Sequence, residues 1–524
     1  MISRRTLIRS VPVAALAGAL AAPRLASPAY AAEPAQAASD SWLVDRYGQA
    51  LNLDWPGKVV SDEQLRREYA EEAARLARVR PDRRRYDRYG GLKELGRHRA
   101  TGYFRFEQVD GRWWFVTPAG HLFFLKAVDA FSPEEWGYGT WWKKTDGTPL
   151  DLFAELPDPE RFAACYTEGE KGYCVSFLKA NLMRKYGDDY LRRWRETSRK
   201  RMIDWGFNAQ GKWTRDPEVV MPYIAQAPTP PDVIRVQWGI DPFDPEFSAK
   251  LDRTFDLEQY RKDPWLIGYF FENERGWSRD VVTDVVKRDS TLAAKTAFVD
   301  YLTETYGGDL NRVNVLLGTS AESFQALADT PLTIGKVPDA DVKAFITLAS
   351  ETYFRKVREA IMKQDPNHLF LGGSLVPTWR TSPEWNVGGR DHLDAISFDW
   401  YSTSVDYLRQ YEGYGKPILN LEFAFMVPDR GLTAANAVTT ATSQADRGEK
   451  YRAFVEAQAK SPAFVGFGWF AAYDQAVTHK PGATEAFNVG LTNQQDQPYH
   501  EMTDVMREVN RGIEAVHLQA PPLA

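Results

Sequence analysis

From about residue 120 onward, short apolar runs bounded by turn residues alternate with longer amphipathic stretches. A strand buried on both faces of a parallel sheet reads as a continuous hydrophobic run, and amphipathic stretches of this length are typical of helices. The pattern predicts helices over 291–306, 341–364 and 447–460, for example. It predicts eight strands, within the runs 122–131, 207–213, 222–227, 265–274, 368–376, 393–401, 417–425 and 464–472.

Eight strands with intervening helices predict an α/β fold, a (β/α)8 TIM barrel with loop insertions. The third strand, 222–227, is the weakest of the eight because it is short and bracketed by prolines. A doubly wound open sheet would also alternate strands with helices. However, no glycine-rich phosphate-binding motif follows any of the runs, so nucleotide binding has no support.

The ends of the chain predict separate segments. Residues 1–31 combine Arg4-Arg5, an apolar run over 11–22 and an Ala29-Tyr30-Ala31 cleavage site, a pattern similar to a twin-arginine signal peptide. The apolar run is shorter than the roughly 20 residues needed to span a membrane. We therefore expect a periplasmic or secreted protein with a helical arm over 32–99 that wraps the barrel, the catalytic barrel over 100–515 and a tail over 516–524.

Composition removes several classes of function. The 65 Lys and Arg residues and 71 Asp and Glu residues are mixed along the chain, giving a net charge of −6 and no basic face for nucleic acid or an anionic membrane. The seven His residues are scattered, so we expect no catalytic metal, and nothing indicates a cofactor. Cys165 and Cys174 could form one disulfide or remain thiols. The sequence does not indicate an oligomeric state.

Two of the apolar runs carry a glutamate where a parallel barrel places its working residues, at the carboxyl ends of the strands. The run 265–274 ends in Asn273-Glu274, and Glu422 lies inside the otherwise apolar run 417–425. Either residue alone could be a hydrogen-bonded core carboxylate. A closed barrel, however, brings strands four and seven to opposite sides of one opening. The pair therefore predicts glycosidic bond cleavage by two carboxylates.

The separation of the two carboxyl groups would decide the stereochemistry: about 5–5.5 Å for retention, and about 6.5–9.5 Å for inversion. We assign Glu274 as the acid/base, because its apolar strand and the charge of Glu422 should both raise its pKa. Glu422 is then the nucleophile. Asn273 is expected to donate to the sugar 2-hydroxyl, and Tyr401 to hold Glu422 ionised or simply to line the barrel.

Aromatic residues make up 13% of the chain, more than core packing normally requires, so some should contact substrate. Trp469 is the first choice among them, and each candidate could instead belong to the core. Asn208, at the start of the second strand, is a weaker candidate for a substrate hydrogen bond. The aromatic candidates at strand ends are Trp213, Trp277, Trp379 and Trp469.

Blocks spread over most of the chain resemble glycoside hydrolase family 50, the β-agarases, within the clan A retaining glycoside hydrolases. The chain departs from the family pattern at Leu421, Ala424 and Gly468, next to the predicted nucleophile and in the last strand. Contacts to the sugar are expected to differ there. The blocks that carry the resemblance include 109–114, 118–121, 206–208, 241–245, 263–270, 429–431, 488–491 and 497–499.

The resemblance implies a secreted retaining β-glycosidase that acts on a polysaccharide or its oligosaccharides, with an agarose-type β-galactan as the first expectation. Another clan A activity is the nearest alternative: a β-glucanase, a β-mannanase or an exo-β-galactosidase. A barrel that binds carbohydrate without cleaving it is the alternative from another class. It would need the aromatic groove but neither glutamate.

Overall fold

The computed structural model describes residues 44–134, 139–144, 146–169, 172–377, 380–478 and 485–523. Its centre is a parallel sheet in the order β13-β12-β9-β8-β4-β16-β15-β14. The bridge between Leu375 and Phe398 joins the region after β13 to β14 and closes the circle. The eight strands are β4 (Leu125–Val128), β8 (Ala209–Gln210), β9 (Tyr223–Ala227), β12 (Leu266–Phe271), β13 (Leu369–Phe370), β14 (Ile396–Asp399), β15 (Ile418–Phe423) and β16 (Phe464–Trp469).

Each of the eight predicted runs contains one barrel strand, in the predicted order around the barrel, which confirms the predicted fold. The short third strand is present as β9, paired with β8 and β12, because the flanking prolines lie just outside the ladder. Every residue of β12, β15 and β16 is buried. Burial on both faces explains why these strands appear in the sequence as unbroken apolar runs.

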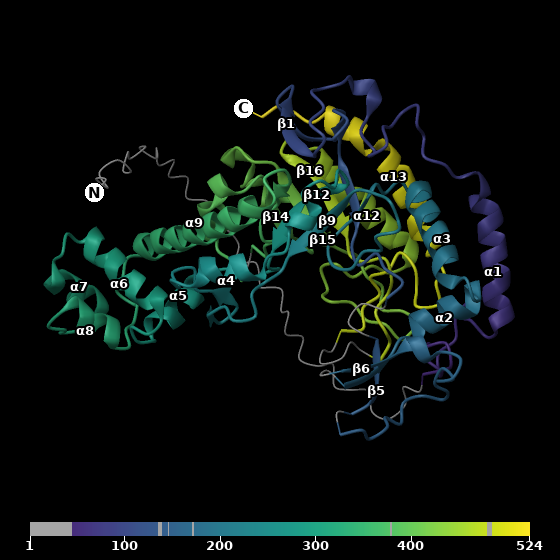
Figure 1. Ribbon diagram of the computed structural model, residues 1–524, viewed down its shortest axis with the longest axis horizontal. Coiled ribbons are helices and arrows are strands. Elements are labelled where there is room, and N and C mark those ends of the chain that lie inside the picture. The colour runs from purple at the N-terminus through teal and green to yellow at the C-terminus, as the bar shows by residue number, and fades with distance from the viewer. Residues whose placement is uncertain are drawn as a thin grey trace.

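Helices cover the outside of the barrel, and the three predicted ones are present as α6, α9 and α12 (Figure 1). The helices are α2 (Phe177–Tyr186), α3 (Tyr190–Trp205), α4 (Phe247–Thr254), α5 (Arg279–Val286), α6 (Ala293–Thr305), α7 (Leu310–Leu317), α8 (Phe324–Asp329), α9 (Asp339–Gln364), α10 (Pro383–Gly388), α11 (Asp406–Arg409), α12 (Gln444–Ala459) and α13 (His500–Leu518). Figure 1 shows α6, α7 and α8 at the far end of a projection that α9 connects to the barrel.

The segment before the barrel contains α1 (Asp62–Arg75), which lies beside α2 and α3 (Figure 1). Ser61 caps this helix by accepting a hydrogen bond from the Gln64 N–H. Buried Arg201 on α3 pairs with Glu72 on α1 at 2.6 Å and with Asp496 at 2.5 Å. This network fixes the arm to the barrel, because breaking a buried ion pair costs about 3–5 kcal/mol.

The last helix, α13, continues past the expected boundary at 515 and ends at Leu518. The reason is packing: the His517 side chain is buried and bonds the carbonyl oxygens of Ala459 and Trp113 at 2.9 Å each. The predicted tail over 516–524 therefore begins inside a docked helix. The predicted signal peptide over 1–31 lies outside the described residues.

Smaller sheets pack around the barrel: β1 (Arg105–Val109), β2 (Arg112–Val116) and β3 (Leu122–Phe123) in one, β5 (Thr140–Lys143), β6 (Tyr166–Gly169) and β7 (Gly172–Val175) in another, and β10 (Arg235–Val236) with β11 (Gly239–Ile240) in a third. Cys165 and Cys174 are buried thiols in the second group rather than a disulfide. Among the described residues, none of the helices combines the length and apolar character needed to cross a membrane.

Candidate active site

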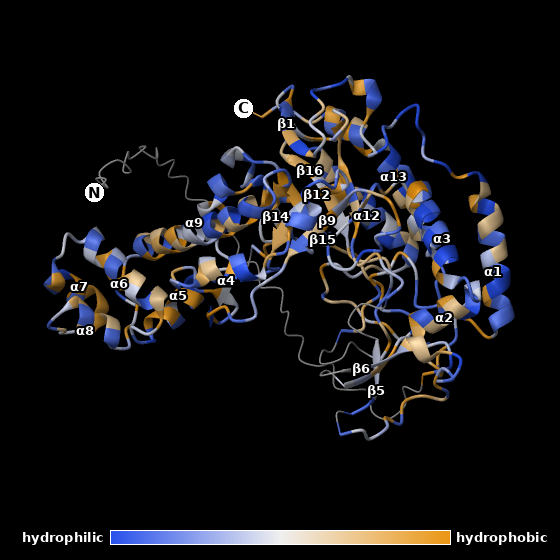
Figure 2. Ribbon diagram, in the orientation of Figure 1, coloured by the Kyte–Doolittle hydropathy of each residue, from blue (hydrophilic) through white to orange (hydrophobic). Residues whose placement is uncertain are grey.

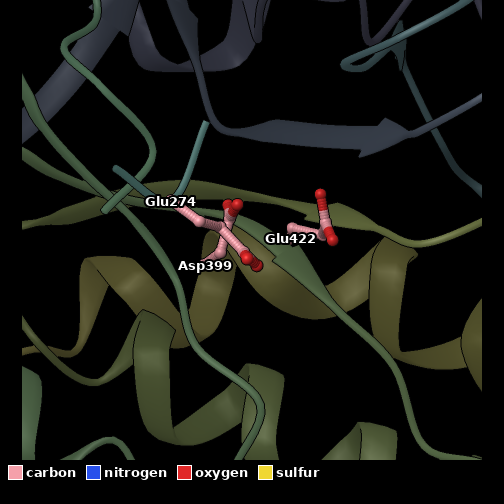
Figure 3. A group of neighbouring side chains, drawn as sticks. All are labelled: Glu274, Asp399 and Glu422. Atoms are coloured by element: carbon pink, nitrogen blue, oxygen red, sulfur yellow. The ribbon is translucent and has the colours of Figure 1, made fainter. Parts of the chain in front are cut away.

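Acidic side chains from three barrel strands meet at the carboxyl end of the sheet (Figure 3). Glu274 follows β12, Asp399 is the last residue of β14, and Glu422 lies in β15 one residue before its end. One carboxylate oxygen from each of the three lies within 4.8 Å of the others. The barrel therefore brings together the two glutamates that the sequence places far apart, and adds a third acid that was not predicted.

The backbone before and after these residues is shaped to present them. Glu274 has a left-handed φ of 54°, and its N–H donates to the Ser374 carbonyl oxygen at 2.9 Å. Ser374, after β13, and Trp213, after β8, also have left-handed φ values of 49° and 69°. Such conformations cost about 1–3 kcal/mol each in residues other than glycine. They turn the chain sharply at three strand ends and direct the side chains toward one point.

A buried lysine, Lys212, holds the acidic groups together. Its Nζ lies 2.7 Å and 2.8 Å from the two oxygens of Asp399 and 2.8 Å from Glu422 Oε2. It also donates to Asn273 Oδ1 at 2.7 Å and to Ser374 Oγ at 3.0 Å. The Lys212 side chain is completely buried, so these contacts replace water as its solvation.

Lys212 is placed by the residue before it and by Asp129. The Lys212 N–H donates to Asp129 Oδ1 at 2.8 Å. A Cβ at Gly211 would lie 1.9 Å from the same oxygen, so only glycine permits this approach. Burial raises the pKa of Asp129 well above its usual range. Burial alone would lower the pKa of Lys212, but the charges of Asp399 and Glu422 outweigh it and raise that pKa.

The two glutamates differ in their surroundings. Burial, and then the charge of Glu422, raise the pKa of Glu274 to about 7. Glu422 instead accepts a hydrogen bond from the Tyr401 hydroxyl at 2.8 Å and from Trp213 Nε1 at 3.1 Å, in addition to the Lys212 contact. Three donors, one of them a cation, thus surround the Glu422 carboxylate. Glu274 is thus suited to hold a proton, whereas the Glu422 carboxylate is held in place by hydrogen-bond donors.

Both glutamates reach solvent, while Lys212 and Asp399 beneath them do not. The side chains of Glu274 and Glu422 are 16% and 9% exposed, whereas those of Lys212 and Asp399 are fully buried. Arg380 Nη1 also lies 3.1 Å from Glu274 Oε2. A ligand can therefore touch the two glutamates without displacing the charged network beneath them.

Comparison with known proteins identifies the relatives of this chain. It matches no protein-family model. Beta-agarase B of Vibrio sp. (strain JT0107) is 30% identical over an alignment that covers 90% of this chain and 54% of that protein. The solved structure of an exo-beta-agarase superimposes with a TM-score of 0.82 at 27% identity, covering 92% of this chain and 74% of the other. The structure of PfGH50B gives a TM-score of 0.82 at 27% identity, covering 90% and 75%.

These similarities support the assignment to glycoside hydrolase family 50 that the sequence indicated. The resemblance seen in the sequence is thereby confirmed. The chain spans about half the length of the curated relatives it matches.

The structure brings several of the predicted substrate-binding residues to the glutamates. The predicted contact between Tyr401 and Glu422 is present. Trp213 is half-buried and bonds Glu422 directly. Asn273 lies beside Lys212, whose Nζ donates to its side-chain oxygen.

Three other residues that were predicted to contact substrate do not line the site of the two glutamates. Trp469 and Trp277 are fully buried, and their indole nitrogens donate to the carbonyl oxygens of Val489 and Ile240. Neither can offer a face to a sugar, because loops and helices pack over these strand ends. Asn208 precedes β8 at the opposite end of the barrel, and its side chain bonds the backbone of Lys126 and Phe124. Trp379 lies outside the described residues.

Sequence reasoning did not single out Lys212, Asp399, Ser374 or Arg380 at this site. Asp399 offered a signal, since a carboxylate ending the apolar run 393–401 follows the same rule that found Glu274 and Glu422. Lys212 also lies near the end of a predicted strand, the run 207–213, but a single lysine at such a position is common. Its role depends on partners from four other strands, which the sequence does not place.

The three carboxylates are close enough to hold a cation together. The Lys212 ammonium already lies against Asp399 and Glu422 and supplies a positive charge there. A metal ion at this point would have to compete with that ammonium for the same oxygens.

Proposed function

We propose that this chain is a retaining β-glycoside hydrolase acting on agarose or its oligosaccharides. The observation that carries the proposal is the proximity of the Glu274 and Glu422 carboxylates, whose nearest oxygens lie within 4.8 Å. That spacing is closer to the about 5–5.5 Å of retaining enzymes than to the about 6.5–9.5 Å of inverting enzymes. The agarase relatives support the choice of substrate.

The geometry divides the reaction between the two glutamates. Glu422 attacks the anomeric carbon while Glu274 donates its proton to the leaving glycosidic oxygen. In the resulting glycosyl-enzyme, Glu422 is an uncharged ester. The charge that helped to raise the pKa of Glu274 is then gone, so the Glu274 carboxylate is better suited to remove a proton from the attacking water. The amide nitrogen of Asn273 would donate to the sugar 2-hydroxyl.

Lys212 and Asp399 act through Glu422 as positioning residues. We expect Lys212→Met to lower the free energy of unfolding by about 3–5 kcal/mol, because Asp399 would be left as an unpaired buried charge. The double variant Lys212→Met/Asp399→Asn should recover most of that stability. In both variants kcat should stay at least about 100-fold low, because Glu422 has lost its cation. Thermal unfolding and steady-state kinetics separate the two effects, and near-normal kcat in the stable double variant would contradict this role.

Product analysis on a panel of polysaccharides tests the substrate. We expect release of oligosaccharides from agarose and none from β-glucan or β-mannan, with products of retained anomeric configuration by NMR. Release from β-glucan or β-mannan alone would replace agarose as the substrate. Initial formation of the inverted anomer would overturn the retaining mechanism.

We further propose that residues 1–31 direct export through a twin-arginine pathway. Support comes from Arg4-Arg5, the apolar run over 11–22 and the Ala29-Tyr30-Ala31 site. An extracellular or periplasmic location would place the enzyme where a polysaccharide is accessible.

A further inference from the structure

A cavity of about 510 Å³ lies at the end of the barrel opposite the glutamates. The barrel residues in its wall come just before strands: Asn208 before β8, Pro222 before β9 and Trp265 before β12. The other walls come from the arm segment 78–90 and from α3 and α13. The volume is in the range of small-molecule sites, about 300–1,000 Å³, and suits one or two sugar units.

The cavity wall is strongly basic although the whole chain is acidic. Eight basic and three acidic residues line it, against a net charge of −6 for the chain. The three carboxylates already have partners. Asp82 and Asp87 accept backbone N–H groups of their own turns, and Asp204 pairs with Arg507 at 2.8 Å. Of the wall's arginines, Arg511 also lies 3.7 Å from Asp204, and no other forms an ion pair with these three carboxylates among the described residues.

Five of the lining arginines lack a carboxylate partner within the described part of the chain. Arg83 and Arg80 donate to backbone oxygens, and Arg88 to the Tyr89 hydroxyl. Arg199, on the predominantly hydrophilic helix α3 (Figure 2), is half-buried and has no hydrogen bond. Burial and the nearby charge of Arg83 lower the pKa of Arg199. Two guanidinium groups that form no ion pair with the described carboxylates, those of Arg83 and Arg199, thus line one cavity. The five are Arg78, Arg80, Arg83, Arg88 and Arg199.

The same cavity has an apolar wall. Trp265 is half-buried, with its ring 4.7 Å from that of Tyr89. Val220 is 51% exposed and lines the cavity beside Met221. An aromatic face with aliphatic neighbours suits the C–H face of a sugar ring, and guanidinium groups bind sulfate and carboxylate oxygens in pairs.

The geometry points to an accessory binding site for a sugar unit that carries a sulfate or carboxylate group. Arg83 and Arg199 bind the anionic group, and Trp265 contacts the ring. The site is separate from the glutamates, so it would hold an anionic segment of a polysaccharide without taking part in its cleavage.

Calorimetric titration of the full chain tests this site, with Glu422→Gln present to prevent cleavage. The probes are a sulfated galacto-oligosaccharide, its desulfated counterpart and inorganic sulfate. We expect the sulfated sugar to bind more tightly than either of the others. In Arg83→Gln/Arg199→Gln its affinity should fall at least about tenfold, while the desulfated sugar binds as before. In Trp265→Ala the sulfated sugar should lose its advantage over inorganic sulfate.

The matched control is Arg66→Gln/Arg192→Gln, which removes the same charge from exposed sites on α1 and α3 outside the cavity. It should bind the sulfated sugar normally, and thermal unfolding checks that each variant is folded. Equal binding of sulfated and desulfated sugar would overturn the proposal, and so would an equal loss in the control. Binding of inorganic sulfate as tightly as the sulfated sugar would overturn the sugar contact. None of these results depends on catalysis.

Discussion

Replacement of Glu422 by Gly is expected to lower kcat by at least about 10⁴-fold, because the attacking carboxylate is removed while the fold is kept. Azide should restore turnover by entering the space left at Glu422. It would attack from the side of the missing nucleophile and give a glycosyl azide of inverted, α configuration. Product NMR and steady-state kinetics with and without azide measure both effects.

The control for this prediction is Glu449→Gln, an exposed glutamate on α12 that pairs with Arg452 at 3.3 Å. Its kcat should match that of the unmodified enzyme. A β-configured azide product from Glu422→Gly would show that Glu422 is the acid/base and that the two roles are exchanged. Unchanged turnover in Glu422→Gly would remove the residue from the chemistry altogether.

Replacement of Glu274 by Gln should lower kcat by about 10²–10⁴-fold on galactan oligosaccharides, whose leaving groups need a proton. An aryl glycoside with an acidic phenol needs none, so for this substrate the first chemical step should be nearly unaffected. A burst of phenol followed by slow turnover is the expected time course. Equal losses on both substrates would contradict the acid role of Glu274.

The pH profile of the same variant gives a second measurement. The pKa of Glu274 is raised to about 7 by burial and by Glu422, and the acid works only when protonated. The kcat/KM of the unmodified enzyme should therefore fall as the pH rises above about 7. In Glu274→Gln this alkaline decline should disappear. A decline that persists would have to come from another group, and Glu274 would not be the titrating acid.

The order and number of barrel strands were predictable from the sequence. Strands buried on both faces, such as β12 and β15, must be apolar at every position, and this makes them visible as uninterrupted runs. The same physics makes the proposed catalytic pair recognisable in the sequence. A carboxylate at the end of such a run is costly to bury, so Glu274 and Glu422 stand out against their strands.

The aromatic contacts were less predictable. Trp213, Trp277 and Trp469 all lie near strand ends, yet only Trp213 contacts a glutamate. Whether a tryptophan is exposed depends on what packs over it, and the covering segments come from distant parts of the chain. Trp469, for example, bonds the Val489 carbonyl oxygen. Sequence position alone does not contain that information.

The sequence by itself determined the barrel and the two glutamates, because burial restricts which residues a strand can contain. Only the tertiary structure decided how the burial and the charged neighbours of the two glutamates differ. The charge network of Lys212 joins groups from five strand ends, and the separation and burial of Glu274 depend on how the strands close. Electrostatic interactions act through space over a few ångströms, so they depend on distances that exist only after the chain has folded.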